Sequence, residues 1–404
     1  MDMKYAIILP DGAADEPLDE LGGRTPLEVA DKPYMDAIAE TGRIGTVRTV
    51  PEGYVPGSDV ATMSLLGYDV HKHYSGRAPI EAVARNIQTG PDDIVFRCNL
   101  VYIADGLMMD FTAGHIGSPE GAQLMAALNA ALADEGVKFH AGMSYRNLMI
   151  TTDPAAMDVS CMPPHDIPGE AVAGYLPKGK GAERIRRIME RGSKVVAEHE
   201  VNQVRRDLGE TPATAIWLWG QGRVPIMQRF RQRFGVRGAV IAAVDLIRGL
   251  GKLFGWTLIE VPGATGYIDT DYAAKGRAAV KALDEYDLVT VHIEAPDEAG
   301  HMGDAAAKVE ALERVDELIV GPVLEKLRTF DQWRILVSPD HPTPVAKKTH
   351  TDTPVPFCMA GSGVPRGTGI SRDSGPARFT ERVAETSDLH IEQGHELMEY
   401  FLRS

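Results

Sequence analysis

Three short apolar runs in this chain each lead into an aspartate, and this pattern constrains the fold more than any other feature. The runs span residues 5–10, 288–296 and 333–339, and the acids that follow them are Asp11, Asp297 and Asp340. Short runs rich in Val and Ile predict buried strands. In open α/β sheets, ligands bind just beyond the carboxyl ends of such strands. The three acids are therefore expected to meet at one edge of a parallel sheet.

Histidines accompany two of these acids at spacings typical of metal ligands. His301 lies four residues after Asp297. His341 follows Asp340 directly, and His350 comes nine residues later, in a chain with only 12 histidines in 404 residues. Carboxylate and imidazole together suit zinc or manganese. The pattern predicts a site for two metal ions, which is a common arrangement in enzymes that transfer phosphoryl groups.

Composition argues against several kinds of partner. Charged residues at 25% and hydrophobic residues at 44% are typical of a soluble globular protein. A net charge of −15 disfavours nucleic acid and anionic membranes. No apolar run reaches the roughly 18 residues of a spanning helix, and the N-terminus lacks a signal-peptide layout. Cys98, Cys161 and Cys358 lie in or beside apolar stretches, as reduced thiols do. We expect a cytoplasmic protein that binds neither nucleic acid nor membrane, with an oligomeric state that the sequence does not indicate.

The length of the chain predicts two domains, because 404 residues exceed one ordinary core. Residues 1–76 and 213–404 alternate strands with helices and predict an α/β core with a parallel sheet. Residues 77–212, where arginines recur among short strands, predict an inserted, smaller α+β domain. Within it, residues 154–181 are rich in Pro, Gly and Asp and predict a loop or hinge, and residues 182–208 predict helices with a solvated, charged face.

Ser58 has two interpretations from the residues alone. It follows the turn Pro56-Gly57 and precedes a helical pattern that begins at Val60. A serine in this place is often an N-cap. The same place puts a hydroxyl at the positive end of a helix dipole, where anions bind. From the local sequence alone the N-cap is the more common of the two, and the anion-binding interpretation stays open beside it.

In chain order, the aspartates, histidines and Ser58 resemble the ligand set of the alkaline phosphatase superfamily. Within it, the chain is similar to cofactor-independent (2,3-bisphosphoglycerate-independent) phosphoglycerate mutases of the archaeal type, from Tyr5 almost to the C-terminus. The blocks that carry the resemblance are Leu9-Pro-Asp-Gly12, Pro56-Gly-Ser-Asp-Val-Ala61, Ser75-Gly-Arg-Ala-Pro79, Phe96-Arg-Cys-Asn-Leu100, Ser144-Tyr-Arg-Asn147, Pro262-Gly-Ala-Thr-Gly266 and Asp340-His341. The resemblance implies an alkaline-phosphatase-like core with an inserted lid.

The resemblance also implies roles for individual residues. Ser58 would be the nucleophile that becomes phosphoserine. Two divalent ions, Mn²⁺ or Zn²⁺ with Mg²⁺ as a further candidate, would be the cofactors. One would be held by Asp297, His301 and His350, and the other by Asp11, Asp340, His341 and the Ser58 oxygen. The expected reaction is the interconversion of 3- and 2-phosphoglycerate, an isomerase step of glycolysis on a small phosphorylated acid. Arg97, Arg146 and Arg248 are the candidates for holding this substrate.

Two departures from the archaeal pattern leave an alternative substrate open. Trp219 stands where these mutases carry an arginine, and His115 follows Thr112-Ala-Gly114 where an arginine is common. With residues 292–297 and 390–395, they are similar to a bacterial sister branch proposed to phosphorylate homoserine. The chain lacks the phosphate-binding loop of conventional nucleotide enzymes. A plain metal-dependent phosphatase would need no lid, and a non-enzymatic role would leave the ligand cluster without a use.

Overall fold

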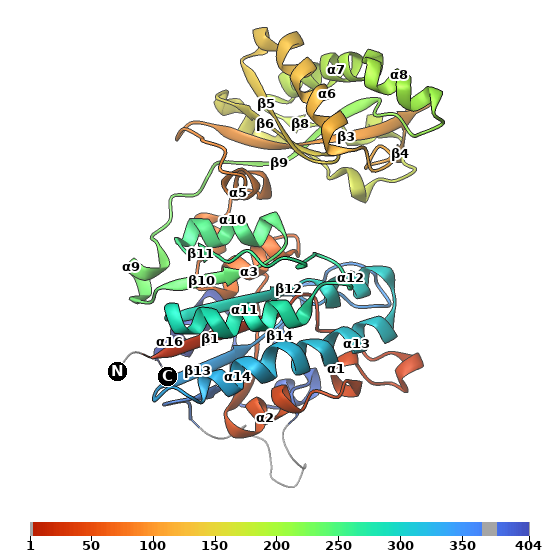
Figure 1. Cartoon of the computed structure of the whole chain (residues 1–404). Helices are drawn as coiled ribbons and strands as arrows, with labels where there is room; N and C mark the ends of the chain where they lie inside the picture. The colour runs from red at the N-terminus through yellow and green to blue at the C-terminus, as the bar shows by residue number, and fades with distance from the viewer. Residues whose placement is uncertain (1–2, 366–377, 404) are drawn as a thin grey trace. The chain divides into compact units, whose positions relative to one another are not determined.

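The protein divides into two compact units, and its computed structural model describes residues 3–365 and 378–403 (Figure 1). The core unit comprises Met1–Tyr74 and Met227–Ser404, and the inserted unit comprises Ser75–Ile226. The chain therefore leaves the core near residue 74 and returns to it near residue 226.

An eight-stranded sheet forms the centre of the core unit, in the order β11-β10-β12-β1-β13-β14-β2-β15. Neighbours from β11 to β13 are parallel, whereas β14 is antiparallel to β13 and to β2. The parallel sheet that the apolar runs predict is thus present around β1, and β14 departs from it. The strands are β1 (Lys4–Pro10), β2 (Arg43–Val47), β10 (Gly238–Ile241), β11 (Thr257–Leu258), β12 (Leu288–Ile293), β13 (Trp333–Val337), β14 (Val355–Gly361) and β15 (His390–Ile391).

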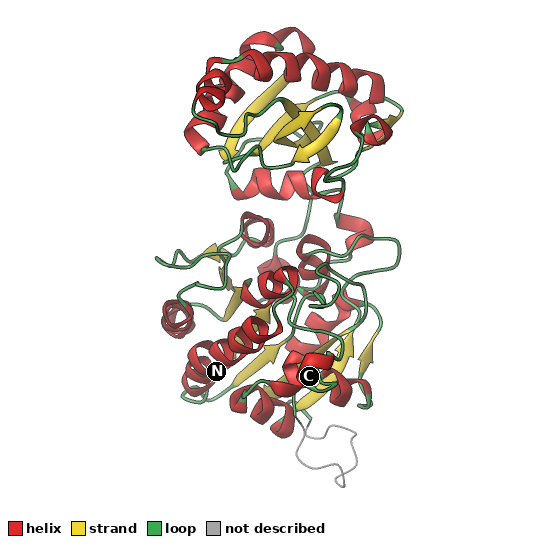
Figure 2. Ribbon diagram, turned by 90° about the vertical axis from the view of Figure 1, so that its right-hand side faces the viewer, coloured by secondary structure: helices red, strands yellow, loops and turns green. Residues whose placement is uncertain are grey.

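Helices cover this sheet (Figures 1 and 2). The side chains on both faces of its central strand, β1, are buried. Ala6 and Ile8 of β1 belong to a core cluster with α11, α13 and α14, while Ile7 and Leu9 are equally buried on the opposite face. This burial explains why the strands are continuous apolar runs. The helices of the core unit are α1 (Pro26–Val29), α2 (Pro33–Thr41), α3 (Ser58–Leu65), α4 (Val70–His73), α9 (Phe230–Phe234), α10 (Asp245–Phe254), α11 (Tyr272–Glu285), α12 (Ala295–Met302), α13 (Ala305–Val315), α14 (Gly321–Leu327), α15 (Glu381–Glu385) and α16 (Leu397–Arg403).

A local sequence signal explains one of these helix boundaries. Thr25 caps α1 and accepts a hydrogen bond from the Glu28 backbone N–H at 3.1 Å, while the Glu28 carboxylate accepts one from the Thr25 N–H. This reciprocal capping box explains why the helix begins at Pro26. At the end of α13, a π-helical stretch, Asp316–Val320, leads into α14, so the helical winding changes between these two helices.

The inserted unit is built on a second, antiparallel sheet in the order β4-β3-β6-β5, with β9 pairing with β3. Helices α6 and α7 contribute to the same hydrophobic cluster as its strands. The elements are α5 (Arg77–Ala84), β3 (Ile94–Ala104), β4 (Leu107–Asp110), α6 (Ser118–Ala131), β5 (Val137–Met143), β6 (Arg146–Thr151), β7 (Val159–Ser160), β8 (Lys178–Gly179), α7 (Ala182–Glu198), α8 (Glu200–Asp207) and β9 (Ala215–Gly222).

The position of β9 corrects the second domain boundary predicted at 212/213. Leu218 and Trp217 of β9 pair with β3 in antiparallel register, so β9 completes the inserted sheet and the boundary falls after residue 226. The apolar run at 215–219 is consistent with either sheet, and only long-range pairing decides between them. Residues 154–181 are likewise part of the inserted unit and not a hinge, because the chain crosses between units elsewhere.

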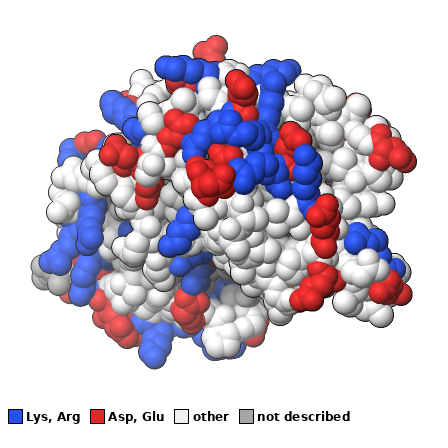
Figure 3. Space-filling model, turned by 90° about the horizontal axis from the view of Figure 1, so that it is seen from above, with Lys and Arg blue, Asp and Glu red and all other residues white. Residues whose placement is uncertain are grey.

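Helix α7 carries the charged face that the arginine-rich segment predicts. Ile185 and Ile188 face the core of the inserted unit. On the outer face, Arg187 and Arg191 lie 3.0 Å and 2.7 Å from Glu135. Figure 3 shows basic and acidic side chains interspersed over one face of the molecule. None of the helices in the described parts of the chain is long and apolar enough to cross a membrane.

Candidate metal centre and active site

The order of strands in the core sheet brings the three predicted aspartates together. Strands β12, β1 and β13 are parallel neighbours, so their carboxyl ends lie at one edge of the sheet. Asp11 follows β1 directly, Asp340 lies in the segment after β13, and Asp297 lies in the first turn of α12, just beyond β12. All three are buried. Three segments distant in sequence therefore deliver carboxylates to one place.

Asp297, His301 and His350 form the first group of donors. The His301 Nε2 lies 3.3 Å from Asp297 Oδ2, and the His350 Nε2 lies 3.4 Å from Asp297 Oδ1. The two Nε2 atoms lie 2.9 Å apart. Asp297 and His301 are four residues apart on α12, a spacing that places them on one helix face. One carboxylate and two imidazoles that converge in this way could hold one divalent cation.

Asp11, Asp340 and His341 form the second group, together with a histidine that the apolar-run argument did not single out. His341 Nε2 lies 3.3 Å from Asp11 Oδ1 and 3.6 Å from Asp340 Oδ2. His292, inside β12, has its Nε2 at 3.3 Å from Asp11 Oδ2. Donor atoms of Asp11, His292 and Asp340 all lie within 4.8 Å of one another, as do those of Asp11, Asp297 and His341. Asp11 and Asp297 thereby link the second group to the first.

The imidazoles are oriented by bonds made on the far side of each ring. The Nδ1 of His301 lies 3.0 Å from the Lys348 carbonyl oxygen, and that of His350 lies 3.3 Å from the Pro56 carbonyl oxygen. The Nδ1 of His341 contacts the carbonyl oxygen of the next residue at 3.4 Å. A ring that donates its Nδ1–H to a carbonyl leaves the Nε2 lone pair available to a metal. All three rings present Nε2 to the carboxylates.

The electrostatics of the cluster also fit bound cations. Burial, followed by the neighbouring Asp340 and Asp297 carboxylates, raises the pKa of Asp11 well above its usual range. Burial opposes ionisation of Asp297, but hydrogen bonds with His301 and His350 outweigh it and hold the Asp297 pKa well below its usual range. Asp11 Oδ1 is a buried oxygen without a hydrogen bond among the described residues. Crowded, buried carboxylates of this kind are relieved by divalent cations, so the donors present fit such ions.

Ser58 lies next to this cluster and is not the cap of its helix. Gly57 is the N-cap of α3, and Ser58 is the first helical residue. Its Oγ lies 3.4 Å from Asp11 Oδ2 and 3.1 Å from His341 Nε2. The first turn of a helix offers unpaired N–H groups and a positive dipole end to an anion. Of the two interpretations of Ser58, the structure therefore excludes the N-cap.

Helix α3 also contacts one carboxylate of the candidate metal site. One turn after Ser58, the Thr62 hydroxyl donates to Asp340 Oδ2 at 3.2 Å, and the His341 N–H donates to Asp340 Oδ1 at 2.9 Å. The Thr343 hydroxyl donates to Asp297 in the same region. The predicted nucleophile and the carboxylates are thus fixed by the same short segments.

The structure does not gather the three predicted substrate arginines with this cluster in a single unit. Arg97 and Arg146 belong to β3 and β6 of the inserted unit, whereas Arg248 lies on α10 of the core unit. The guanidinium of Arg248 contacts the Glu260 carboxylate at 3.0 Å. The Arg146 Nε donates to the Tyr145 hydroxyl at 3.1 Å.

Arg97 is engaged within the inserted unit. Its Nε donates to the Glu81 carboxylate at 3.1 Å, and its guanidinium lies 4.5 Å from the centre of the Trp219 ring. Trp219 thus makes a cation–π contact with Arg97. The residue that departs from the archaeal pattern is therefore built into the same cluster as a predicted substrate ligand.

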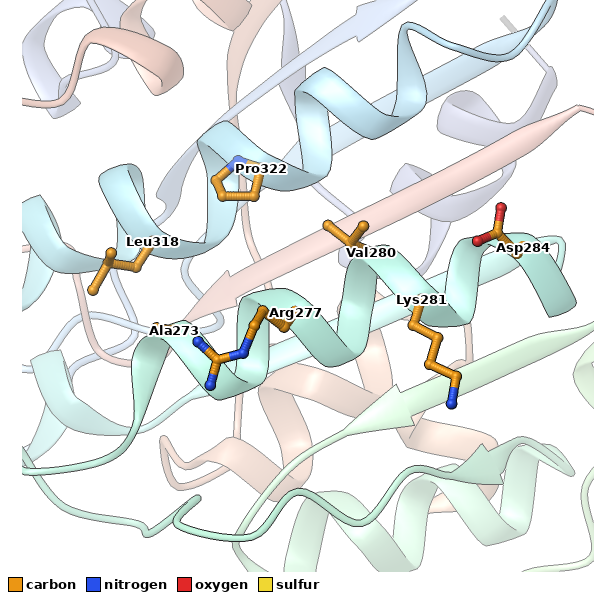
Figure 4. Close-up of a pocket in the computed structure, with 7 residues that line it drawn as sticks. All are labelled: Ala273, Arg277, Val280, Lys281, Asp284, Leu318 and Pro322. Carbon is orange, nitrogen blue, oxygen red and sulfur yellow. The ribbon is translucent and has the colours of Figure 1, made fainter.

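A surface groove in the helical layer is separate from the metal-binding candidates. This groove, with a volume of about 540 Å³, lies between α11 and the segment from the π-helical stretch to α14. Arg277 and Lys281 line it from α11, and Leu318 and Pro322 line it from the other side (Figure 4). It shares no residue with the carboxylate–imidazole cluster, so the candidate site is defined by its donor atoms and not by this cavity.

The fold and the cluster together define a class: α/β proteins that gather carboxylates and imidazoles able to hold divalent cations at the carboxyl edge of a parallel sheet. Residues 39–202 match the family model described as 2,3-bisphosphoglycerate-independent phosphoglycerate mutase. A protein of that name from Methanothrix thermoacetophila is 52% identical over 363 residues, which cover 90% of this chain and 92% of the relative. The chain belongs to the family of 2,3-bisphosphoglycerate-independent phosphoglycerate mutases, which are isomerases.

Solved structures share the fold. A protein from Pyrococcus horikoshii is similar with a TM-score of 0.82 and 28% identity, over 100% of this chain and 97% of its own. The cofactor-independent phosphoglycerate mutase from Thermoplasma acidophilum has a TM-score of 0.66 and 23% identity, over 100% of this chain and 99% of its own. The fold of this chain is therefore shared with solved structures over nearly their whole length.

Proposed function

We propose that this enzyme interconverts 3-phosphoglycerate and 2-phosphoglycerate without bisphosphoglycerate, through a phosphoryl group held transiently on Ser58. Family membership supports the overall reaction. The observation that carries the route is the position of the Ser58 Oγ, which lies within 3.4 Å of Asp11 and His341 at the start of α3. A hydroxyl among metal-binding candidates at the N-terminus of a helix is suited to attack phosphorus and to hold the resulting anion.

We further propose that two divalent ions, manganese or zinc, are the cofactors. Asp297, His301 and His350 would hold one ion, and Asp11, Asp340, His341 and the Ser58 oxygen would hold the other. When bound, such ions lower the pKa of a coordinated hydroxyl and neutralise phosphoryl oxygens. The Nδ1 contacts of the three histidines support this assignment, since they leave each Nε2 directed to the carboxylates.

The proposed reaction has two balanced halves. In the first, a bond forms between Ser58 Oγ and phosphorus while the bond from phosphorus to the glycerate oxygen breaks. The proton that the serine loses is matched by the proton that the departing alkoxide gains. In the second half, the other hydroxyl of the same glycerate attacks phosphorus, the Oγ–phosphorus bond breaks and Ser58 regains a proton. No external phosphoryl donor is needed, because the phosphate returned is the one that was taken.

The substrate contacts are also proposals. Arg146 and Arg248 are offered as groups that neutralise the carboxylate and phosphate of the substrate, since a guanidinium binds either in a two-pronged fashion. Arg97 is the third proposed group. Its guanidinium is paired with Glu81, as that of Arg248 is with Glu260, so the substrate would replace or share these carboxylate partners. The inserted unit would act as the lid that keeps water from the phosphoserine.

Phosphorus NMR of the metal-loaded enzyme tests this function. With 3-phosphoglycerate and no bisphosphoglycerate, we expect the 2-phosphoglycerate signal to grow to equilibrium with little inorganic phosphate. Ser58→Ala should abolish this conversion, and Ser64→Ala on the same helix serves as its matched control. Release of inorganic phosphate alone would make the enzyme a phosphatase. Untouched 3-phosphoglycerate together with phosphorylation of homoserine by ATP would replace the proposed substrate.

A further inference from the structure

A row of four buried side chains runs from the interior of the core unit to Asp11. It consists of Lys275 on α11, Glu294 and His292 at the end of β12, and Asp11 after β1, and each is at most 3% exposed. Register explains how the row forms, because Leu9 of β1 pairs with His292. Leu9 and Asp11 are two residues apart and extend toward the same face of the sheet, so His292 comes to lie beside the aspartate.

The inner half of the row is anchored at several points. Lys275 donates to Glu294 Oε2 at 2.9 Å and to the main-chain carbonyl oxygen of His292 at 3.2 Å. The other carboxylate oxygen of Glu294 accepts bonds from the backbone N–H groups of Ala243 and Val244, at 3.2 Å and 3.3 Å. A buried carboxylate with a buried ammonium and two amide donors is held in one position. Glu294 is thus a fixed, charge-balanced support.

The outer half of the row places the His292 ring between two carboxylates. Its Nδ1 lies 3.2 Å from Glu294 Oε1, and its Nε2 lies 3.3 Å from Asp11 Oδ2. Among the described residues, neither contact has the geometry of a hydrogen bond, so the ring packs between the two carboxylates. The contact engages Oδ2 of Asp11, whereas Oδ1 faces His341 Nε2 at 3.3 Å. The two oxygens of Asp11 therefore have different neighbours.

We infer that His292 is a positioning residue for Asp11, which it holds so that the carboxylate can bind a metal ion. This inference rests on the proposed metal site. Asp11 is buried near two further carboxylates, Asp340 and Asp297, which repel it. Glu294 and Lys275 hold His292 in place through its Nδ1 and its main-chain carbonyl oxygen. The Nε2 of the same ring contacts Asp11 Oδ2 and thereby limits rotation of the Asp11 carboxylate. Residues that orient metal-binding carboxylates in this way raise metal affinity about 10- to 100-fold.

Metal titration of His292 variants tests this role in the full-length protein. His292→Leu removes both ring nitrogens at similar volume, and His292→Gln keeps an amide N–H that can reach Asp11. We expect His292→Leu to weaken the affinity for one of two Mn²⁺ ions about 10- to 100-fold. His292→Gln should show a smaller loss, and the second ion, at Asp297, should bind as before. The matched control is Thr290→Val, an isosteric change at a buried position on the same face of β12.

Several results would overturn the inference. Equal Mn²⁺ affinity of the wild type and His292→Leu would do so, as would a parallel loss at both ions or a loss in His292→Gln as large as in His292→Leu. Absorption spectra at saturating Co²⁺ should keep the same coordination in all variants, and loss of a nitrogen ligand in His292→Leu would make His292 a ligand instead of a positioning residue. A wild-type protein that binds no metal would refute the proposed metal site itself, which separates that failure from this one.

Discussion

Gly12 is the position where a single added methyl group should disturb the candidate site most directly. It follows Asp11 and has a φ of +62°, in the left-handed region. A Cβ there would lie 2.5 Å from Thr343 Oγ1, 2.6 Å from Asp297 Oδ1 and 2.8 Å from Asp297 Cα. The left-handed conformation costs an alanine about 1 kcal/mol, and forced overpacking adds about 1–3 kcal/mol. Gly12→Ala should therefore lose about 3 kcal/mol of stability and displace the Asp297 carboxylate.

Gly22 provides the control that separates strain from contact. Its φ is +66°, and a Cβ there would have nothing within 4 Å. Gly22→Ala should lose only the conformational part, about 1 kcal/mol, and should leave metal binding unchanged. Urea unfolding of the metal-free proteins measures stability, and Mn²⁺ titration measures the displacement of Asp297. Equal stability losses in the two variants, or unchanged Mn²⁺ binding in Gly12→Ala, would refute the packing argument.

Three further predictions concern charge, the nucleophile and the metals. Burial raises the pKa of Glu381 from 4.5 to about 7. The folded protein therefore binds this proton more tightly than the unfolded chain does. The resulting contribution to the free energy of unfolding is fully present below pH 4.5 and is lost as the pH rises through 7. Relative to Glu381→Gln, the wild type should lose roughly 2 kcal/mol over this range in urea unfolding, after allowance for the partly exposed side chain, and a constant difference would contradict the assignment. Ser58→Ala should fold normally by circular dichroism yet lose at least about a thousandfold in turnover, as expected when a nucleophile is removed, and retained turnover would exclude Ser58. His301→Ala should bind one metal ion fewer by elemental analysis, while His395→Ala, outside the cluster, should bind as the wild type, and full metal content in both would remove His301 from the site.

The sequence anticipates those parts of the site that depend on local pattern. Apolar runs that end in Asp11, Asp297 and Asp340 are visible without any structure, because strands buried on both faces must be continuously apolar. The four-residue spacing of Asp297 and His301 needs only the period of a helix. In such cases, short-range geometry decides the outcome, and the residues can be recognised in order along the chain.

Pairing between distant segments decides which sheet a strand joins and which side chains meet, and the sequence pattern does not reveal either. Residues 215–222 have the pattern of a core strand, yet β9 completes the inserted sheet because its partner is β3. His292 is an ordinary residue within an apolar run until the register of β12 with β1 sets it beside Asp11. Lys275 lies 17 residues before His292, and only the packing of α11 on the sheet buries it against Glu294. A local pattern fixes which face a side chain occupies, but the neighbour it meets there depends on long-range register and packing.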